Sequence, residues 1–195
     1  MNLAGDMEDT RKWLQVVRDR EEQALRELID LFAAPLRRFI HGIVRNPHDS
    51  EDLAQEAFLR FLNHPQDFSD LKQLRNYLFQ IAHNLAVTKV TSAPSRREEN
   101  VEEMPEVKTE ESSTGRLVRM EQKEQVRELL HGLPPQQRKV VILKNWEDLT
   151  FREIGEILGL AEGTVKAHYF FALRRMKKTL EEKGQEEIER GHRQG

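Results

Sequence analysis

The sequence Leu149–Lys178, LTFREIGEILGLAEGTVKAHYFFALRRMKK, indicates the fold of this chain most directly. Thr150 and Glu153 stand three residues apart, which is the spacing of a capping box at a helix start. Apolar residues then repeat at helical spacing: Ile154, Ile157 and Leu158. Gly159 follows this repeat, at the position where a left-handed helix end favours glycine. The pattern predicts a short helix, a tight turn and a second helix that begins near Glu162.

The second helix of this pair is basic, although the formal net charge of the chain is -3. Between residues 163 and 178 it has no Asp or Glu and five basic residues: Lys166, Arg174, Arg175, Lys177 and Lys178. A basic helix that packs on another helix commonly enters the major groove of DNA. The sequence therefore predicts a DNA-binding helix-turn-helix. The competing interpretation is a basic helix that only keeps the protein soluble.

The composition indicates an intracellular, mostly helical protein. Charged residues make up 33% and hydrophobic residues 37% of the 195 residues, which favours small helical units. The chain has no Cys, and its seven His are scattered, so we expect no metal site and no cofactor. No phosphate-binding glycine loop and no His-Glu-x-x-His motif is present, so we expect no enzymatic activity. The apolar runs are too short for membrane insertion, and the acidic N-terminus does not resemble a signal peptide.

An acidic connector separates two predicted units. Residues 91–120 contain seven Glu, two Pro and no aromatic residue. Such a stretch buries too little apolar surface to offset the entropy of ordering, so we expect a flexible linker. The predicted fold class is all-α, with a helical domain over 8–90 and a helix-turn-helix domain over 121–182.

Turn residues divide both units into helices. In the first unit the expected helices cover 8–18, 21–44, 49–62 and 71–90. In the second unit, before the helix-turn-helix, they cover 121–130 and 136–145. We expect Asp49 or Ser50 to cap the third helix. We also expect a kink or a break at Pro35, which has no amide hydrogen.

Motifs in both units resemble those of bacterial RNA polymerase sigma factors. In the first unit they are Asp49–Phe58, DSEDLAQEAF, and Tyr77–Asn84, YLFQIAHN. In the second unit Leu133-Pro134 and Gly163–Lys166, GTVK, match the C-terminal sigma domain. Their order and spacing are similar to those of the extracytoplasmic-function (ECF) subgroup, which keeps only the second and fourth sigma domains. The resemblance covers about residues 10–180.

The resemblance implies a protein that binds core RNA polymerase, directs it to a bipartite promoter, helps to open the duplex and is then released. Contacts are implied with the β and β′ subunits. The residues that match the surface for the β′ clamp helices are Asp49, Asp52, Leu53, Gln55, Glu56 and Phe58. Arg60, Phe68 and Asn84 match readers of the minus-ten element, where an aromatic ring and an amide suit an unpaired base.

The resemblance also assigns the minus-thirty-five element of promoter DNA to the second unit. The candidate residues are Lys144, Thr164, Lys166, Ala167, His168, Phe171, Arg174 and Arg175. Among them we expect Lys166 to read a base edge. Lys144, Arg174 and Arg175 are expected to bind phosphates, which adds affinity without sequence information. Many relatives have Ser-Arg in place of Ala167-His168 and Arg in place of Phe171, so we expect a different base preference here.

Two further expectations concern partners and alternatives. The resemblance implies an anti-sigma factor, which could hold this cytoplasmic protein near the membrane. The residues alone also allow an autonomous regulator similar to the LuxR-type helix-turn-helix proteins, or a helical adaptor whose basic helix binds an acidic protein. A gel shift with and without core polymerase separates these functions, because only a sigma factor needs core for tight promoter binding.

Overall fold

The computed structural model describes residues 14–92, apart from 16, 18, 65 and 67, and residues 124–193, with side chains as far as residue 185. Every regular element in these ranges is a helix, which confirms the all-α expectation. The expected linker 91–120 lies outside the described residues except for 91 and 92. The expected first helix also lies outside them, except for residues 14, 15 and 17, which are helical.

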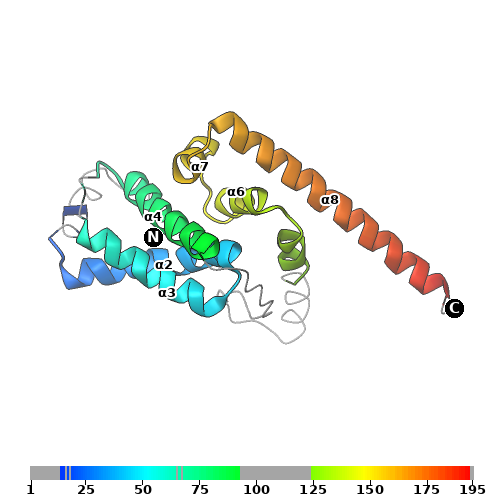
Figure 1. The fold of residues 1–195 in the computed structure, drawn as a ribbon, viewed down its shortest axis with the longest axis horizontal. Coiled ribbons are helices and arrows are strands. Elements are labelled where there is room, and N and C mark those ends of the chain that lie inside the picture. Colours follow the sequence, from blue (N-terminus) through cyan, green and yellow to red (C-terminus); the bar gives the residue numbers. More distant parts are fainter. Residues whose placement is uncertain are drawn as a thin grey trace.

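Three long helices form the N-terminal unit: α2 (Glu22–Val44), α3 (Pro47–Asn63) and α4 (Leu71–Ser92). Each helix has apolar residues at helical spacing, and the three apolar faces meet in one core. Figure 1 shows the three helices packed together. The helices begin and end within two residues of the expected positions. Helix α2 runs through Pro35 without a break, because Phe32 and Leu36 on either side of it pack into the same core.

The N-cap of α3 differs from the expected one. The side chain of Asn46 accepts a hydrogen bond from the amide of Asp49 at 2.9 Å, so Asn46 is the cap. Pro47 follows at the first helical position, where a missing amide hydrogen costs nothing. The expectation of Asp49 or Ser50 as cap was therefore wrong, and both residues lie inside the helix.

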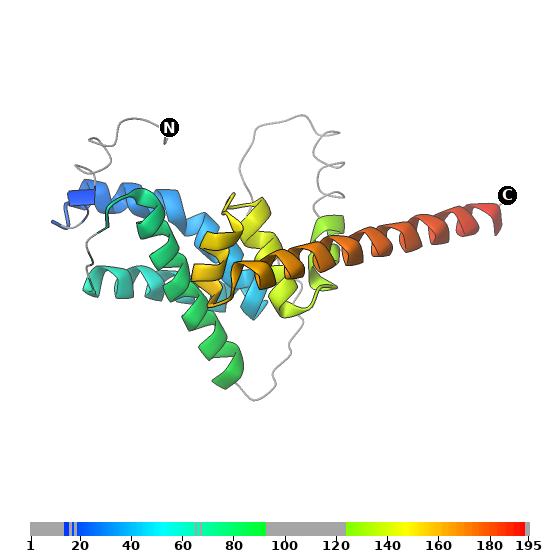
Figure 2. The same ribbon diagram turned by 90° about the horizontal axis from the view of Figure 1, so that it is seen from above.

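The C-terminal unit begins with a helical segment over 124–131. It continues with α6 (Pro135–Asn145), α7 (Phe151–Leu158) and α8 (Glu162–Arg193). Helix α8 has 32 residues, which corresponds to about 48 Å. Its C-terminal part projects away from the rest of the molecule (Figures 1 and 2). It extends beyond residue 182, where the expected domain ended.

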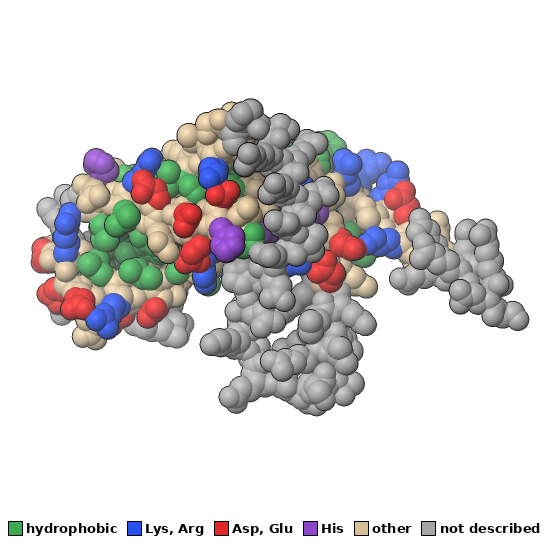
Figure 3. All heavy atoms as spheres, turned by 60° about the horizontal axis from the view of Figure 1, so that its bottom comes forward, with side chains coloured by type: hydrophobic (Ala, Val, Ile, Leu, Met, Phe, Trp, Pro, Cys, Tyr) green, Lys and Arg blue, Asp and Glu red, His purple; other side chains and the backbone are tan. Residues whose placement is uncertain are grey.

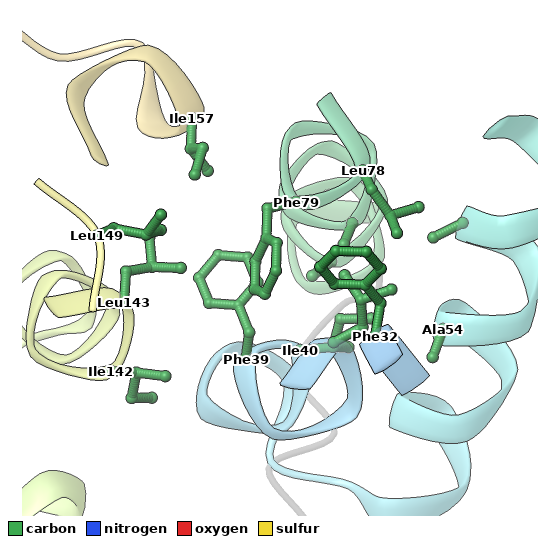
Figure 4. Packing of buried hydrophobic residues seen from close by; sticks show 14 of the residues in the cluster. Phe32, Phe39, Ile40, Ala54, Leu78, Phe79, Ile142, Leu143, Leu149 and Ile157 are labelled. Atoms are coloured by element: carbon green, nitrogen blue, oxygen red, sulfur yellow. The ribbon is translucent and has the colours of Figure 1, made fainter. Parts of the chain in front are cut away.

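The two units pack against each other through one apolar core. Helices α6 and α7 contact α2 and α4, and in Figure 1 they lie between the N-terminal unit and α8. In Figure 4 the rings of Phe39 and Phe79 point towards Leu143 and Leu149 of the C-terminal unit. All four side chains are fully buried. This contact places the helix-turn-helix beside α4.

Candidate nucleic-acid and polymerase interfaces

Local hydrogen bonds define the helix-turn-helix formed by α7 and α8. The Thr150 hydroxyl accepts from the Glu153 amide at 3.2 Å, and the Thr150 amide donates to the Glu153 carboxylate at 2.7 Å. These two bonds confirm the expected capping box. Gly159 ends α7 with a φ of 67°, as expected from the sequence. A Cβ atom on Gly155 would lie 2.6 Å from the Leu160 carbonyl oxygen, so the close turn requires glycine there.

Helix α8 has a buried face and an outward face. Val165 and Ala172 are fully buried and pack α8 against the rest of the C-terminal unit. Phe170 and Phe171 face outward and are 65% and 52% exposed. Exposed basic residues follow them: Arg174, Arg175, Lys177 and Lys178. Figure 3 shows Lys and Arg side chains gathered on this helix. The outward face of α8 is therefore aromatic and basic.

The predicted minus-thirty-five residues on the first turns of α8 have different surroundings. Thr164 and Ala167 are exposed, whereas His168 is half-buried. Lys166 is exposed and forms an ion pair with Glu162, one turn earlier, at 2.6 Å. Such an exposed pair contributes little stability, so Lys166 can exchange it for another partner at small cost.

The other predicted basic residues differ in how far their side chains are already engaged. Lys144 is on α6, where its Nζ atom lies 5.6 Å from the centre of the Phe151 ring and 3.8 Å from an Asp148 carboxylate oxygen. Arg174 and Arg175 are exposed, and no ion pair with another described side chain engages them. Their guanidinium groups are available for phosphates.

Phe170 is an outward residue that the sequence interpretation missed. It is more exposed than Phe171, and the two ring centres lie 6.1 Å apart in an edge-to-face arrangement. The signal was present in the sequence, because a helix turns 100° per residue and this sets Phe170 almost opposite Ala172. Together the two rings offer apolar contact to a groove, where a thymine methyl group is the complementary feature.

The candidate polymerase surface lies on α3. Asp52 and Gln55 are exposed, and their polar groups are available to a partner. Glu56 is half-buried and forms an ion pair with Arg60 at 2.7 Å on the same helix. The sequence assigned Arg60 to the minus-ten element, whereas the structure places its guanidinium beside this candidate polymerase surface.

The remaining three residues of that motif have less accessible side chains. Asp49 forms an ion pair with Lys89 of α4 at 2.7 Å, which ties the start of α3 to the end of α4. Leu53 is half-buried. Phe58 is only 7% exposed and belongs to the core of the N-terminal unit. Its position indicates that it supports α3 from inside and is not available for contact with a partner.

Phe68 lies in an aromatic cluster between α3 and α4. Its ring stacks on Phe61 with centres 5.8 Å apart and planes 12° apart, and it lies 5.7 Å from the Tyr77 ring. A cleft of about 260 Å³ opens beside Phe68 and Tyr77. The other side chains that line it are Gln66, Gln73, Asn76 and Gln80, with Glu156 and Ile157 of α7. We call this the minus-ten cleft, after the role that the sequence resemblance predicts for Phe68.

Only one of the three predicted minus-ten residues lines this cleft. Asn84 is exposed on α4, seven residues after Tyr77 and so about 10 Å further along the helix. The sequence interpretation missed the amide side chains of the cleft. Gln73, Asn76 and Gln80 recur at helical spacing, and this spacing could have identified them as one polar face of α4.

Within the described ranges, no group of three His, Asp or Glu side chains is arranged to hold a metal ion. Among the helices that the structure describes, none combines the length and the apolar character needed to cross a membrane.

Comparisons with known proteins match both units. The sigma-70 region 2 family matches residues 28–95, and the sigma-70 region 4 family matches residues 123–176. ECF RNA polymerase sigma factor SigW of Bacillus subtilis is 25% identical over 183 residues, with 87% of this chain and 96% of SigW covered. RNA polymerase sigma-E factor of Streptomyces antibioticus is 30% identical over 140 residues, with 72% and 75% covered.

A solved structure also shares the fold. The structure of CnrH in complex with the cytosolic domain of CnrY has a TM-score of 0.59, at 17% identity, with 90% of this chain and 98% of that chain covered. Sigma factors are transcription initiation proteins that bind core RNA polymerase and promoter DNA, and they are not enzymes. The two sigma-70 regions in order, together with these relatives, of which SigW is named an ECF sigma factor, show that this chain belongs to the ECF sigma factors.

Proposed function

We propose that this sigma factor binds core polymerase through α3, reads the minus-ten element with the minus-ten cleft and reads the minus-thirty-five element with the outward face of α8. The outward face of α8 carries the proposal. Phe170 and Phe171 are exposed there and are followed by exposed Arg174 and Arg175. A helix that is apolar towards its own unit and basic towards solvent suits a major groove. The arginines supply phosphate contacts and the rings supply contacts with base edges.

The minus-ten cleft suits an unpaired base rather than a duplex. Side-chain amides both donate and accept hydrogen bonds, so they can pair with the edge of a base that has left the stack. Phe68 and Tyr77 supply aromatic surface for stacking at the same place. Asn84 and Arg60 then belong to the flanking surface, where they would contact the strand on either side of the flipped base.

The exposed groups of α3 suit the polymerase. Asp52 and Gln55 are free to pair with basic and polar groups on the β′ clamp helices, with further contact to β through the C-terminal unit. Large apolar side chains are exposed in the N-terminal unit as well, including Leu59 on α3, next to the proposed surface. Apolar and polar groups side by side are typical of protein–protein interfaces.

Run-off transcription of genomic fragments with core polymerase, followed by start-site mapping, tests the proposal. We expect transcripts that require both core and this protein and that share two upstream elements. Arg174→Ala should lower the yield, whereas the control Arg152→Ala on α7 should not, since Arg152 is 81% exposed and pairs with Glu156 on its own helix. Equal promoter binding with and without core would instead indicate an autonomous regulator, and absence of DNA binding would indicate an adaptor.

We further propose an anti-sigma partner and a cytoplasmic location. Exposed apolar side chains on both units would support such a partner: Ile29, Leu31, Leu59, Val90, Leu173 and Leu180. A partner anchored in the membrane would then hold the protein near it. Competition with core polymerase is the expected signature, and a partner that binds while the sigma factor stays attached to core would contradict the proposal.

A further inference from the structure

The first turns of α8 turn one side to their own unit and the opposite side to solvent. Val165 and Ala172 are fully buried on the inner side. Because an α-helix has 3.6 residues per turn, the positions opposite them can be read from the sequence. Four exposed residues lie on this outer side: Gly163, Ala167, Phe170 and Phe171. We call these four residues the apolar ridge.

The apolar ridge has no side chain that forms hydrogen bonds. Hydrogen, methyl and phenyl side chains neither donate nor accept. A Cβ atom added to Gly163 would meet nothing within 4 Å, so the first turn leaves open space on this side. The nearest polar side chains, Thr164 and Lys166, lie on either side of the ridge, at its margins. The side chains in the middle of this face therefore cannot read the donors and acceptors of a base.

The two rings are the parts of the ridge that reach furthest into solvent. Phe170 and Phe171 are 65% and 52% exposed, and their ring centres lie 6.1 Å apart. Base pairs are stacked about 3.4 Å apart along B-form DNA, so this separation corresponds to about two base steps. The pair of rings can therefore contact two neighbouring base pairs at the same time.

Basic residues surround the ridge and indicate DNA as its partner. Lys166 and Lys177 lie along one margin and Arg175 along the other, and Arg174 follows the rings on the ridge side. All four side chains are exposed. An apolar strip between two basic margins is complementary to a DNA groove, in which base edges lie between two phosphate backbones. The charges therefore favour DNA over an apolar protein surface.

Base pairs present one apolar group in the major groove, the methyl group on C5 of thymine. Their other major-groove groups are hydrogen-bond donors and acceptors, for which the ridge has no partner. 5-Methylcytosine carries the same methyl group at the same ring position. A surface that recognises only the methyl group would therefore accept either base.

We propose that the apolar ridge reads the C5 methyl groups of two neighbouring base pairs in the minus-thirty-five element, and that it accepts 5-methylcytosine in place of thymine. The proposal rests on the proposed function and names the base chemistry that the outward face of α8 recognises. Phe170 and Phe171 each cover one methyl group, while the basic margins bind the phosphates on both sides. Methylation of cytosine at either position then strengthens the promoter.

Replacement of thymine by uracil tests the proposal without any change to the protein. Uracil keeps the pairing and the acceptors of thymine and lacks only the methyl group. Each thymine of the minus-thirty-five region is replaced singly in a duplex whose promoter has been mapped by run-off transcription. Gel-shift competition then measures binding by core polymerase together with this protein. We expect uracil to weaken binding about fourfold at two neighbouring positions, the factor that corresponds to burial of one methyl group.

Variants of the rings show whether they cause this discrimination. Phe170→Ala and Phe171→Ala should each abolish the difference between thymine and uracil at one of the two positions. Phe171→Leu should keep part of it, because leucine is also apolar. The control is Arg174→Ala, which should weaken binding to both duplexes equally and leave their ratio unchanged. Both rings are exposed, so helical content and core binding should match wild type.

The methylated base gives a second, independent measurement. At the two positions cytosine should bind more weakly than thymine, and 5-methylcytosine should recover about fourfold in affinity. The matching alanine variant should remove this recovery.

Three results would overturn the proposal: no thymine position sensitive to uracil, an unchanged thymine-to-uracil ratio in both alanine variants, or no gain from 5-methylcytosine. Loss of core binding by the alanine variants at an unchanged ratio would show that the ridge binds the polymerase instead. If no promoter that requires core polymerase can be mapped, the proposed function fails. The same base substitutions in duplexes selected from a random pool by the protein itself then decide on the ridge.

Discussion

Replacement of Arg138 by Met should strongly destabilise the C-terminal unit. The residue is 3% exposed, and its guanidinium donates to four backbone carbonyls. The bonds to Leu130 and Leu133 are both 2.8 Å long, and the bond to His131 is 3.3 Å long. Burial, with a smaller contribution from Arg45, lowers the pKa of Arg138 to about 10, so it remains charged at neutral pH. Methionine keeps the apolar stem and removes every donor.

The magnitude follows from the two short bonds. A hydrogen bond from a charged group contributes about 1.5–3 kcal/mol, so two give about 3–6 kcal/mol. The cost of burying the guanidinium offsets part of this contribution. We therefore expect the free energy of unfolding to fall by about 3–4 kcal/mol. At a typical urea dependence of about 2 kcal/mol per M, the midpoint should fall by about 1.5–2 M.

Urea unfolding followed by Trp146 fluorescence measures this change. The chain has two Trp, at 13 and 146, so a Trp13→Phe background leaves Trp146 as the reporter of the C-terminal unit. Arg152→Met is the control, because Arg152 forms an exposed ion pair with Glu156, and the loss of this pair should lower the free energy of unfolding by less than about 0.5 kcal/mol. If the free energy of unfolding of Arg138→Met lies within about 1 kcal/mol of that of the Trp13→Phe parent, the four bonds to carbonyl groups do not have the stabilising role assigned to them.

Three other predictions test the interfaces. Asp52→Lys combined with Glu56→Lys should weaken core binding about tenfold at unchanged helical content, and unchanged pull-down of core by the folded variant would exclude this surface. Lys166→Ala should weaken the free energy of promoter binding by about 1–3 kcal/mol and relax the base preference at one upstream position. Arg174→Ala should instead weaken binding to all sequences and lower the salt dependence of binding. If Lys166→Ala weakens binding equally on every upstream sequence, Lys166 is another phosphate contact. Burial and the charge of Lys139 lower the pKa of His83 to about 4 from 6.5, so unfolded protein takes up the proton first as the pH falls. The contribution of His83 to the free energy of unfolding is therefore complete above about pH 6.5 and should fall by about 3 kcal/mol on going to pH 4. His83→Gln should reduce the fall of the urea midpoint between these pH values. An unchanged pH dependence of the midpoint would contradict the lowered pKa of His83.

The sequence determined the local structure well because short-range signals are sufficient for it. The capping box of Thr150 and Glu153 and the left-handed end at Gly159 involve bonds between residues at most four apart. The helix boundaries followed from apolar periodicity and turn residues in the same way. The N-cap of α3 was also a local feature, yet it was misassigned, because Asn46 was assigned to the turn and the acidic residues after it to the cap. The family motifs identified both sigma regions, and the comparisons confirm them.

The tertiary structure decided which predicted residues are accessible. Phe58 and Phe68 have the same side chain, yet Phe58 is buried in the core and Phe68 borders a cleft. The sequence gives no local signal for this difference, since it depends on which helices pack around each ring. Phe170 is exposed as well as Phe171, and the two rings form one aromatic pair on the outward face of α8.

The packing of the two units could be learned only from the tertiary structure. Arg38 and Glu147, which form one of its ion pairs, are 109 residues apart in the sequence, and Arg75 and Glu153 are 78 apart. No periodicity or capping rule links residues so distant, because their contact depends on the summed fit of α6 and α7 on α2 and α4. The sequence determined by itself the helices and the chemistry that each carries. The three-dimensional packing alone decided that Glu156 and Ile157 of α7 line the cleft beside Phe68 and Tyr77.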